Sequence, residues 1–299
     1  FYNHLVMSTQ VNGNFDGDFP FRTTFPIGPE ARQLESLPTL PALKSPLIRN
    51  PLVLAARVAS RMAWAGLGFV LYGLQLPAAL LGRPEWAAQL MTLASGVALR
   101  ALGVQVVVDD SQPSEQPGTP LVHIFNHRSP CDGLVIQAVL KLPGLTTAQL
   151  HLKWVLPGYA AAARNAGSAV LDHRQPQSRL AGLMSASTLL RDHGEIMIAP
   201  NGSLVTPIEE RVSSSAWMLA QHYGASIVPW VFRYEGLEGA VGARYKPLRL
   251  LLRRLTAPLG TIHCRRGRSS DLKLPQDPRD RDGFSCAVQQ YYREQQESG

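Results

Sequence analysis

The sequence is poor in the residues that disulfide-bonded and zinc-stabilised proteins depend on. Only three cysteines occur among 299 residues, Cys131, Cys264 and Cys286, and no two of them form a CxxC pair. Their wide spacing predicts neither a disulfide framework nor a structural zinc site, so we expect a reducing compartment. Charged residues are also scarce, at 17%, whereas 45% of the residues are hydrophobic. A chain of this length and composition can bury a substantial core.

Several other signals are missing. No basic segment followed by an apolar run stands at the start, so we expect no secretory signal peptide. No internal repeat is found, and no G-x-S-x-G elbow that would carry a serine nucleophile. The balance of 29 Lys and Arg against 22 Asp and Glu gives a formal charge of +7 and favours anionic partners. Because no basic strand interleaved with aromatic residues is visible, we expect no nucleic-acid partner.

The amino-acid composition changes along the chain, and these changes predict four parts. Residues 1–50 are rich in Asn, Asp, Pro, Gly and Thr, and we expect an extended or partly disordered leader. Residues 51–103 are apolar and helical in character, and residues 104–263 alternate between short strands and helices. Residues 264–299 are predicted to form a basic tail with a C-terminal helix. The larger segment 241–299 holds 12 Lys and Arg but 6 Asp and Glu, which suits anionic headgroups of membrane phospholipids.

The apolar part contains no charged residue between Arg61 and Arg83. That length suffices to cross a hydrocarbon core, but Pro77 and Pro84 interrupt it, and a second helical stretch over 85–102 follows directly. We expect a membrane-associated helical hairpin that dips into one leaflet. A full membrane span and a pair of buried helices in a soluble protein remain alternatives.

The alternation after residue 103 predicts an α/β fold. Apolar and β-branched runs predict strands over 104–110, 121–125, 151–156, 168–173, 195–199 and 226–232, with helices between several of them. Strands that alternate with helices indicate a mixed, largely parallel sheet flanked by helices. Functional residues in such sheets collect in the loops that leave the carboxyl ends of the strands.

One such loop has the sequence Asn126-His127-Arg128-Ser129-Pro130-Cys131-Asp132. His127 and Asp132 are five positions apart, so an acid in the first helical turn can fold back toward the imidazole. The carboxylate would fix the tautomer of His127, whose other ring nitrogen could take a proton from a hydroxyl. Asp132 also fits a helix-capping role, and both roles can coexist. His123 lies in a predicted strand, so helical metal-ligand spacing does not apply and no metal site is expected.

The His127-x4-Asp132 spacing resembles the first signature block of the glycerolipid acyltransferases, the family of the lysophosphatidate acyltransferases. Three later segments, 167–174, 198–203 and 227–230, resemble the following blocks in the family's order. The resemblance covers residues 100–235, and the preceding hairpin also fits it. Four ordered blocks are far more specific than one.

The resemblance implies an acyltransferase-like catalytic domain over 104–263. A fatty acyl group would pass from an acyl thioester, acyl-CoA or acyl-carrier protein, to the hydroxyl of a lysophospholipid or related lysolipid. His127 would be the general base, oriented by Asp132, and backbone N–H groups near Gly202 would stabilise the oxyanion. No cofactor or metal is implied. The resemblance also implies membrane association, on the cytoplasmic face of the inner or plasma membrane.

The third block departs from the family pattern. Asn201, Ser203 and Leu204 stand where the family has Glu, Thr and Arg, so the acceptor stays open. A catalytically weakened relative that binds lipid or a partner protein is one alternative, and a thioester hydrolase is another. The candidate substrate-binding residues are Asn126, Arg128, Lys153, Arg174, Asn201, Gly202 and Ser203.

Overall fold

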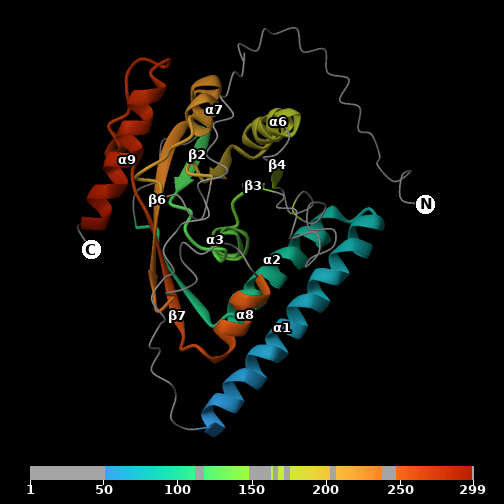
Figure 1. The fold of residues 1–299 in the computed structure, drawn as a ribbon. Coiled ribbons are helices and arrows are strands. Elements are labelled where there is room, and N and C mark those ends of the chain that lie inside the picture. Colours follow the sequence, from blue (N-terminus) through green and yellow to red (C-terminus); the bar gives the residue numbers. More distant parts are fainter. Residues whose placement is uncertain are drawn as a thin grey trace. The chain divides into compact units, whose positions relative to one another are not determined.

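The described part of the chain is built around a five-stranded β-sheet (Figure 1). The structure is a computed structural model, and it describes residues 51–111, 118–147, 163, 168–171, 176–202, 207–237 and 247–297. The chain divides into two units, Phe1–Pro41 and Ala42–Gly299, and every described residue belongs to the second. The predicted leader over 1–50 and the predicted strand over 151–156 lie outside the described residues.

The strands of the sheet lie in the order β1, β7, β6, β2, β5. Their bounds are Val104–Asp109 for β1, Leu121–Phe125 for β2, Glu195–Ile198 for β5, Ser226–Glu235 for β6 and Gly260–Arg266 for β7. β2 is parallel to β5 and β6, and β1 is parallel to β7, whereas β6 and β7 are antiparallel. The prediction of a mixed, largely parallel sheet is therefore confirmed. A second, two-stranded sheet pairs β3 (Leu145–Thr147) with β4 (Ala169–Leu171).

Two hydrophobic clusters cover the two faces of the sheet. Val122 and Ile124 of β2 belong to the cluster under α6 (Pro176–His193), α7 (Ser215–Tyr223) and α9 (Arg281–Glu297). Phe125 belongs to the second cluster, under α2 (Pro84–Ala101) and α3 (Asp132–Val135). Successive residues of a strand point to opposite faces, so the odd-numbered positions of β2 point toward α2 and α3. If the alternation continues past Phe125, His127 lies on the same face of the sheet as α3.

The N-terminal apolar segment forms a helical hairpin, as predicted. The 30-residue helix α1 (Pro51–Leu80) packs against α2, and Gly82 turns the chain between them with a φ of 71°. Arg61 is buried and donates hydrogen bonds to the backbone carbonyls of Arg254, Leu255 and Ala257 at the end of α8 (Pro247–Thr256). A guanidinium placed at the negative end of a helix is favourable, so this contact fixes α1 to the C-terminal part of the chain.

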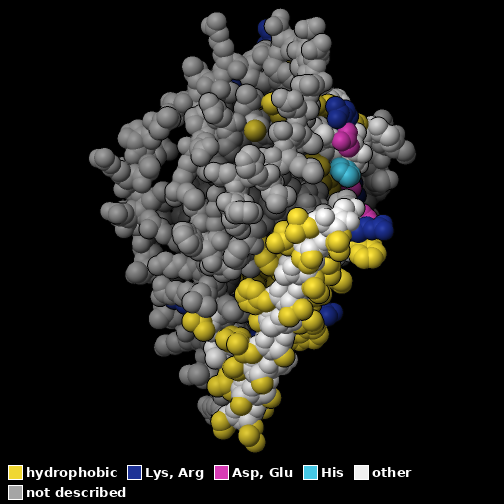
Figure 2. Space-filling model, turned by 90° about the vertical axis from the view of Figure 1, so that its right-hand side faces the viewer, with side chains coloured by type: hydrophobic (Ala, Val, Ile, Leu, Met, Phe, Trp, Pro, Cys, Tyr) yellow, Lys and Arg dark blue, Asp and Glu magenta, His cyan; other side chains and the backbone are white. Residues whose placement is uncertain are grey.

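The outer surface of this hairpin is strongly apolar. Figure 2 shows hydrophobic side chains along the length of α1. The large hydrophobic side chains exposed on the hairpin are Leu52, Val53, Met62, Leu67, Phe69, Val70, Leu74, Leu76, Leu80, Leu81, Trp86 and Leu93. The segment Pro51–Ala78 is the one described helix that is long and apolar enough to cross a membrane, and 6% of that apolar window is buried. A helix pair buried in a soluble core, one of the alternatives, would not leave this surface open.

The C-terminal part contributes more to the fold than a tail would. The expected boundary between residues 263 and 264 falls inside β7, which pairs with both β1 and β6. The predicted C-terminal helix is α9, and its Phe284, Val288, Tyr291 and Tyr292 are buried in the core. Arg254 is also buried, and its guanidinium donates to the carbonyls of Leu102, Gly103, Gly236 and Pro258. Arg254, one of the basic residues beyond 241, therefore serves as an internal anchor.

Candidate active site

The loop after β2 is fixed to β6 by its first residue. The Asn126 side chain donates from Nδ2 to the carbonyl of Phe232 over 2.8 Å, and its Oδ1 accepts from the Phe232 backbone N–H over 2.7 Å. Asn126 is only 5% exposed. Both polar atoms of the Asn126 side chain are thus engaged inside the protein, where they fix the loop to β6.

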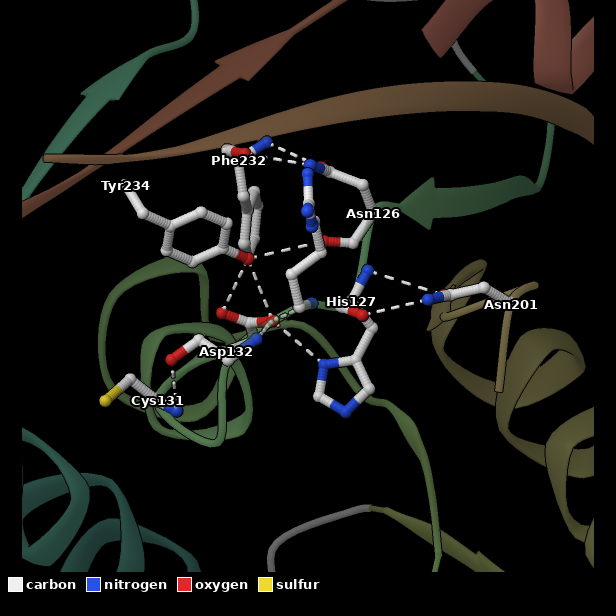
Figure 3. A network of polar contacts seen from close by, with 9 residues as sticks. Asn126, His127, Cys131, Asp132, Asn201, Phe232 and Tyr234 are labelled. Carbon is white, nitrogen blue, oxygen red and sulfur yellow. Dashed lines mark hydrogen bonds and ion pairs between the residues drawn. The ribbon is translucent and has the colours of Figure 1, made fainter. Parts of the chain in front are cut away.

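The next residue meets its predicted partner. His127 Nδ1 lies 2.9 Å from Oδ2 of Asp132, the first residue of α3 (Figure 3). The His127 side chain is 26% exposed, whereas that of Asp132 is 0% exposed. The loop therefore turns back on itself and holds a buried carboxyl group against one nitrogen of a partly exposed ring.

The Asp132 carboxyl group is surrounded by donors. Its Oδ2 accepts the backbone N–H groups of Arg128 and Ser129, each over 3.0 Å. The Tyr234 hydroxyl lies 3.0 Å from Oδ1 and 3.0 Å from Oδ2. The helix begins at Asp132, and its N-cap residue, Cys131, makes no side-chain capping hydrogen bond. Of the two roles that the sequence left open for Asp132, the contact with His127 is the one that the geometry displays.

These contacts determine how the imidazole can react. An ionised carboxylate only accepts hydrogen bonds, so Nδ1 of His127 carries the proton and Nε2 presents a lone pair. Among the described residues, Nε2 has no hydrogen-bond partner, and Figure 3 shows it turned away from Asp132. This arrangement suits abstraction of a proton from a hydroxyl that approaches Nε2, with Asp132 stabilising the imidazolium formed.

The turn after β5 supports the same loop. Asn201 donates from Nδ2 to the His127 carbonyl over 2.8 Å and accepts the His127 N–H at 3.4 Å. Gly202 has a φ of 61°, and its N–H donates to Ala199 O over 3.1 Å. The Asn201 amide is therefore already engaged with backbone, and the Gly202 N–H is not open to an oxyanion. Ser203, Lys153 and Arg174, the other predicted substrate-binding residues of this region, lie outside the described residues.

Arg128 lines a cavity of about 380 Å³ beside the loop. The polar residues that also line it include Arg233 on β6, Gln295 and Gln296 on α9, and Glu209. Arg233 Nη2 donates to the carbonyl of Gln295 over 2.5 Å. The Arg128 guanidinium makes no hydrogen bond or ion pair with the part of the chain that the structure describes, so it is open to an anionic ligand.

His123 is placed away from this chemistry. Its Nδ1 accepts the indole N–H of Trp230 over 3.1 Å, and its Nε2 lies 3.4 Å from Glu195 Oε2. The hydrogen bond to His123 lowers the pKa of Glu195. His123 is 2% exposed, so both ring nitrogens are satisfied in the core. Across the described ranges, no group of three or more His, Cys, Asp or Glu side chains is arranged to hold a metal ion.

Tyr234 is the residue that the sequence analysis missed. It lies on β6, two positions after Phe232 on the same face, and its hydroxyl reaches a carboxylate 102 residues earlier in the chain. The alternation Trp230, Phe232, Tyr234 along the strand is the one signal that points to it. Only the register between β6 and β2 brings that side chain over Asp132.

Part of the chain matches a known protein family, and its fold resembles a solved structure. Residues 105–233 match the family model described as Acyltransferase. The fold resembles the crystal structure of the 1-acyl-sn-glycerophosphate (LPA) acyltransferase, PlsC, from Thermotoga maritima, with a TM-score of 0.51 and 15% sequence identity. That match covers 80% of this chain and 97% of the other. A comparison with curated proteins finds no match.

Proposed function

We propose that this chain, which carries an acyltransferase-family domain over residues 105–233 and has a PlsC-like fold, is a membrane-associated O-acyltransferase. Its reaction would move a fatty acyl group from acyl-CoA or acyl-carrier protein to the hydroxyl of a lysophospholipid or related lysolipid. The observation that carries the proposal is the 2.9 Å contact between His127 and buried Asp132, which leaves Nε2 of His127 facing outward.

The proposed mechanism uses one general base. Nε2 of His127 takes the proton of the acceptor hydroxyl while the hydroxyl oxygen attacks the thioester carbonyl carbon. The tetrahedral intermediate then collapses, the carbon–sulfur bond breaks, and the proton on the imidazolium passes to the leaving thiolate. The products are an ester and a free thiol. Asp132 stabilises the imidazolium between the two proton transfers.

No covalent acyl-enzyme is part of this mechanism. Cys131 is the nearest thiol in the loop, but it is 1% exposed, and burial raises its pKa to about 11. A thiol that stays protonated is a poor nucleophile. The thioester supplies the activation of the acyl group, so the proposal requires neither a cofactor nor a metal ion.

The apolar surface of α1 supports the membrane part of the proposal. A lysolipid acceptor is held in a bilayer, whereas acyl-CoA and acyl-carrier protein are water-soluble, so the enzyme must work at the interface between them. We place the domain on the cytoplasmic face of the inner or plasma membrane, where those thioesters are found. The exposed apolar side chains of the hairpin would enter the headgroup and acyl boundary.

The test is transfer measured on purified full-length protein reconstituted with phospholipid vesicles. Radiolabelled acyl-CoA and acyl-carrier protein are supplied in separate arms, each with a panel of lysolipids that differ in headgroup, and products are identified by mass spectrometry. We expect a new diacyl product that requires both donor and acceptor. Release of free fatty acid without acceptor would instead indicate a thioester hydrolase, and no turnover on any acceptor would indicate a lipid-binding or partner-binding relative.

A further inference from the structure

The Tyr234 hydroxyl occupies the centre of the polar network behind His127. It lies 3.0 Å from each carboxylate oxygen of Asp132 and 3.3 Å from the carbonyl of Asn126. Among the described residues, His127 and Tyr234 are the two side chains that contact this carboxylate. A hydroxyl has one proton to donate. The two oxygens of Asp132 are the closest acceptors, so the Tyr234 hydroxyl donates its hydrogen bond to this carboxylate.

Tyr234 remains a donor over the pH range in which such an enzyme works. Burial, together with the negative charge of Asp132, raises the pKa of Tyr234 well above its usual value. The hydroxyl therefore stays protonated at neutral and mildly alkaline pH, and it continues to donate its hydrogen bond to the Asp132 carboxylate.

We infer that Tyr234 is a positioning residue for the proposed reaction: its hydroxyl holds the Asp132 carboxylate against His127 Nδ1 and limits how strongly that carboxylate attracts the ring proton. This inference rests on the proposed function for its kinetic consequence, but the coupling itself is a property of the free protein. The carboxylate divides its acceptor capacity among its donors. A donor removed from Asp132 strengthens the remaining bond to His127.

Other charged and titratable groups around Asp132 do not supply the same effect. Burial raises the pKa of Cys131 to about 11 and that of Cys264 on β7 to about 12, so both thiols are neutral. The Arg254 guanidinium, from α8, is held by backbone carbonyls. Arg128 lines the cavity, and the hydrogen bond that it donates to Asp132 comes from its backbone N–H. Tyr234 is therefore the group whose removal changes the carboxylate most selectively.

The test compares Tyr234→Phe with Tyr292→Phe. Tyr292 is a matched control because its buried hydroxyl also makes two hydrogen bonds, at 3.1 Å to Ile124 O and 3.0 Å to Trp230 O, but contacts neither Asp132 nor His127. In Tyr234→Phe, we expect the NMR resonance of the His127 Nδ1 proton to move downfield by about 1 ppm as its bond to Asp132 strengthens. Tyr292→Phe should leave that resonance in place.

Kinetics provide the second readout. For Tyr234→Phe, we expect kcat to fall about tenfold with KM unchanged, and the pH of half-maximal kcat on the acid side to rise by about 0.5. Replacing the tyrosine at position 234 by 3-fluorotyrosine strengthens the donor without changing the fold, and should move both the resonance and the acid limb in the opposite direction.

Two outcomes would overturn the inference. One is a His127 resonance that is the same in wild type, Tyr234→Phe and the fluorinated protein. The other is an equal displacement in Tyr292→Phe, which would indicate a general loss of packing. The resonance is measured without substrate, so absence of acyl transfer would refute the proposed function and leave the coupling intact.

Discussion

The side-chain amide of Asn201 donates a hydrogen bond of 2.8 Å to the backbone carbonyl of His127, across 74 residues of sequence. This bond joins the turn after β5 to the loop after β2. It fixes the backbone from which the imidazole extends, and so the direction of Nε2. The placement of the proposed base therefore depends on a residue that contacts its main chain and not its ring.

Asn201→Asp tests this dependence. The substitution keeps the size of the side chain but puts an oxygen where the N–H donor faces the His127 carbonyl, so two acceptors oppose each other. We expect kcat to fall about tenfold and the free energy of unfolding to fall by about 1–3 kcal/mol. Steady-state kinetics and urea denaturation measure the two effects.

Thr92→Val is the matched control for Asn201→Asp. It removes the 3.1 Å bond from Gln137 Nε2 to Thr92 Oγ1, which joins α2 to the segment after α3 and involves neither His127 nor Asn201. We expect some loss of stability and an unchanged kcat. Wild-type kcat in Asn201→Asp would contradict the positioning role of the amide.

Arg128 and Glu209 line the same cavity with opposite charges, so removing one charge or the other should change the KM of an anionic substrate in opposite directions. If the cavity takes an anionic end of a substrate, Arg128→Gln should raise the KM for that substrate about tenfold, and Glu209→Gln should lower it. Arg191→Gln, an exposed arginine paired with Asp192, is the control and should change neither.

Two pairs of substrates identify the source of the anion. Lysophosphatidate is compared with monoacylglycerol as acceptor, and acyl-CoA with acyl-N-acetylcysteamine as donor. The charge effects should follow whichever phosphate-bearing partner occupies the cavity and should vanish for its phosphate-free analogue. Changes of KM in the same direction for Arg128→Gln and Glu209→Gln would refute an anion site.

The exposed surface of α1 predicts the strength of membrane binding. Val70 and Leu74 are 58% and 50% exposed and lie one helical turn apart. The double substitution Val70→Glu with Leu74→Glu replaces two apolar contacts with charges, so we expect partitioning into vesicles of phosphatidylglycerol to fall by about 100-fold or more. Flotation through a density gradient measures the bound fraction.

Met184→Glu supplies the comparison for membrane binding. Met184 is 47% exposed but lies on α6, away from the hairpin. It should leave vesicle binding unchanged. An equal loss of binding in Met184→Glu, or full binding of the double variant, would contradict the role of α1.

Buried thiols and tyrosines make stability depend on alkaline pH. Burial raises the pKa of Cys264 to about 12, and the pKa of Tyr292 well above its usual value. In the unfolded chain these groups lose protons near pH values of about 8.5 and 10. The folded protein thus holds protons that the unfolded chain releases, and the free energy of unfolding should fall as pH rises above about 8.5.

The expected slope is about 1.4 kcal/mol per pH unit for each group that titrates only on unfolding. Urea denaturation at pH 7.5, 9 and 10.5 measures it. Because Cys131 also has a raised pKa, Cys264→Ala should reduce the slope that begins near pH 8.5 by about half, and Tyr292→Phe should reduce the steeper slope above pH 10, to which Tyr234 also contributes. A free energy of unfolding that stays level to pH 10.5 would show that these groups ionise within the fold.

Local sequence was sufficient to predict the strands in which nearly every residue is buried. The run Leu121–Phe125 and the segment Glu195–Ile198 are buried strands and read as such from their apolar residues. The contact between His127 and Asp132 also follows from local spacing, because a strand, a tight turn and a helix start bring the two together.

The missed features depend on distant partners. β7 has the sequence GTIHCRR, in which only alternate residues such as Ile262 and Cys264 are buried, and its arginines made it resemble a tail. Its place between β1 and β6 is set by pairing and not by its own composition. Tyr234 reaches Asp132 only because of the register between β6 and β2, which no local sequence pattern predicts. The hydrogen bonds of Asn126 to Phe232 and of Asn201 to His127 also join distant segments, so the sequence could not show them.

The most direct test of the central claim is the rate of acyl transfer in His127→Ala beside His263→Ala. His263 is a solvent-exposed histidine near Glu235, so its loss is a control for removal of an imidazole. With donor and acceptor saturating, we expect kcat of His127→Ala to fall by at least about 100-fold while vesicle binding and the urea midpoint stay near wild type. His263→Ala should keep the wild-type rate. A folded, membrane-bound His127→Ala protein that transfers acyl groups at the wild-type rate would contradict the account.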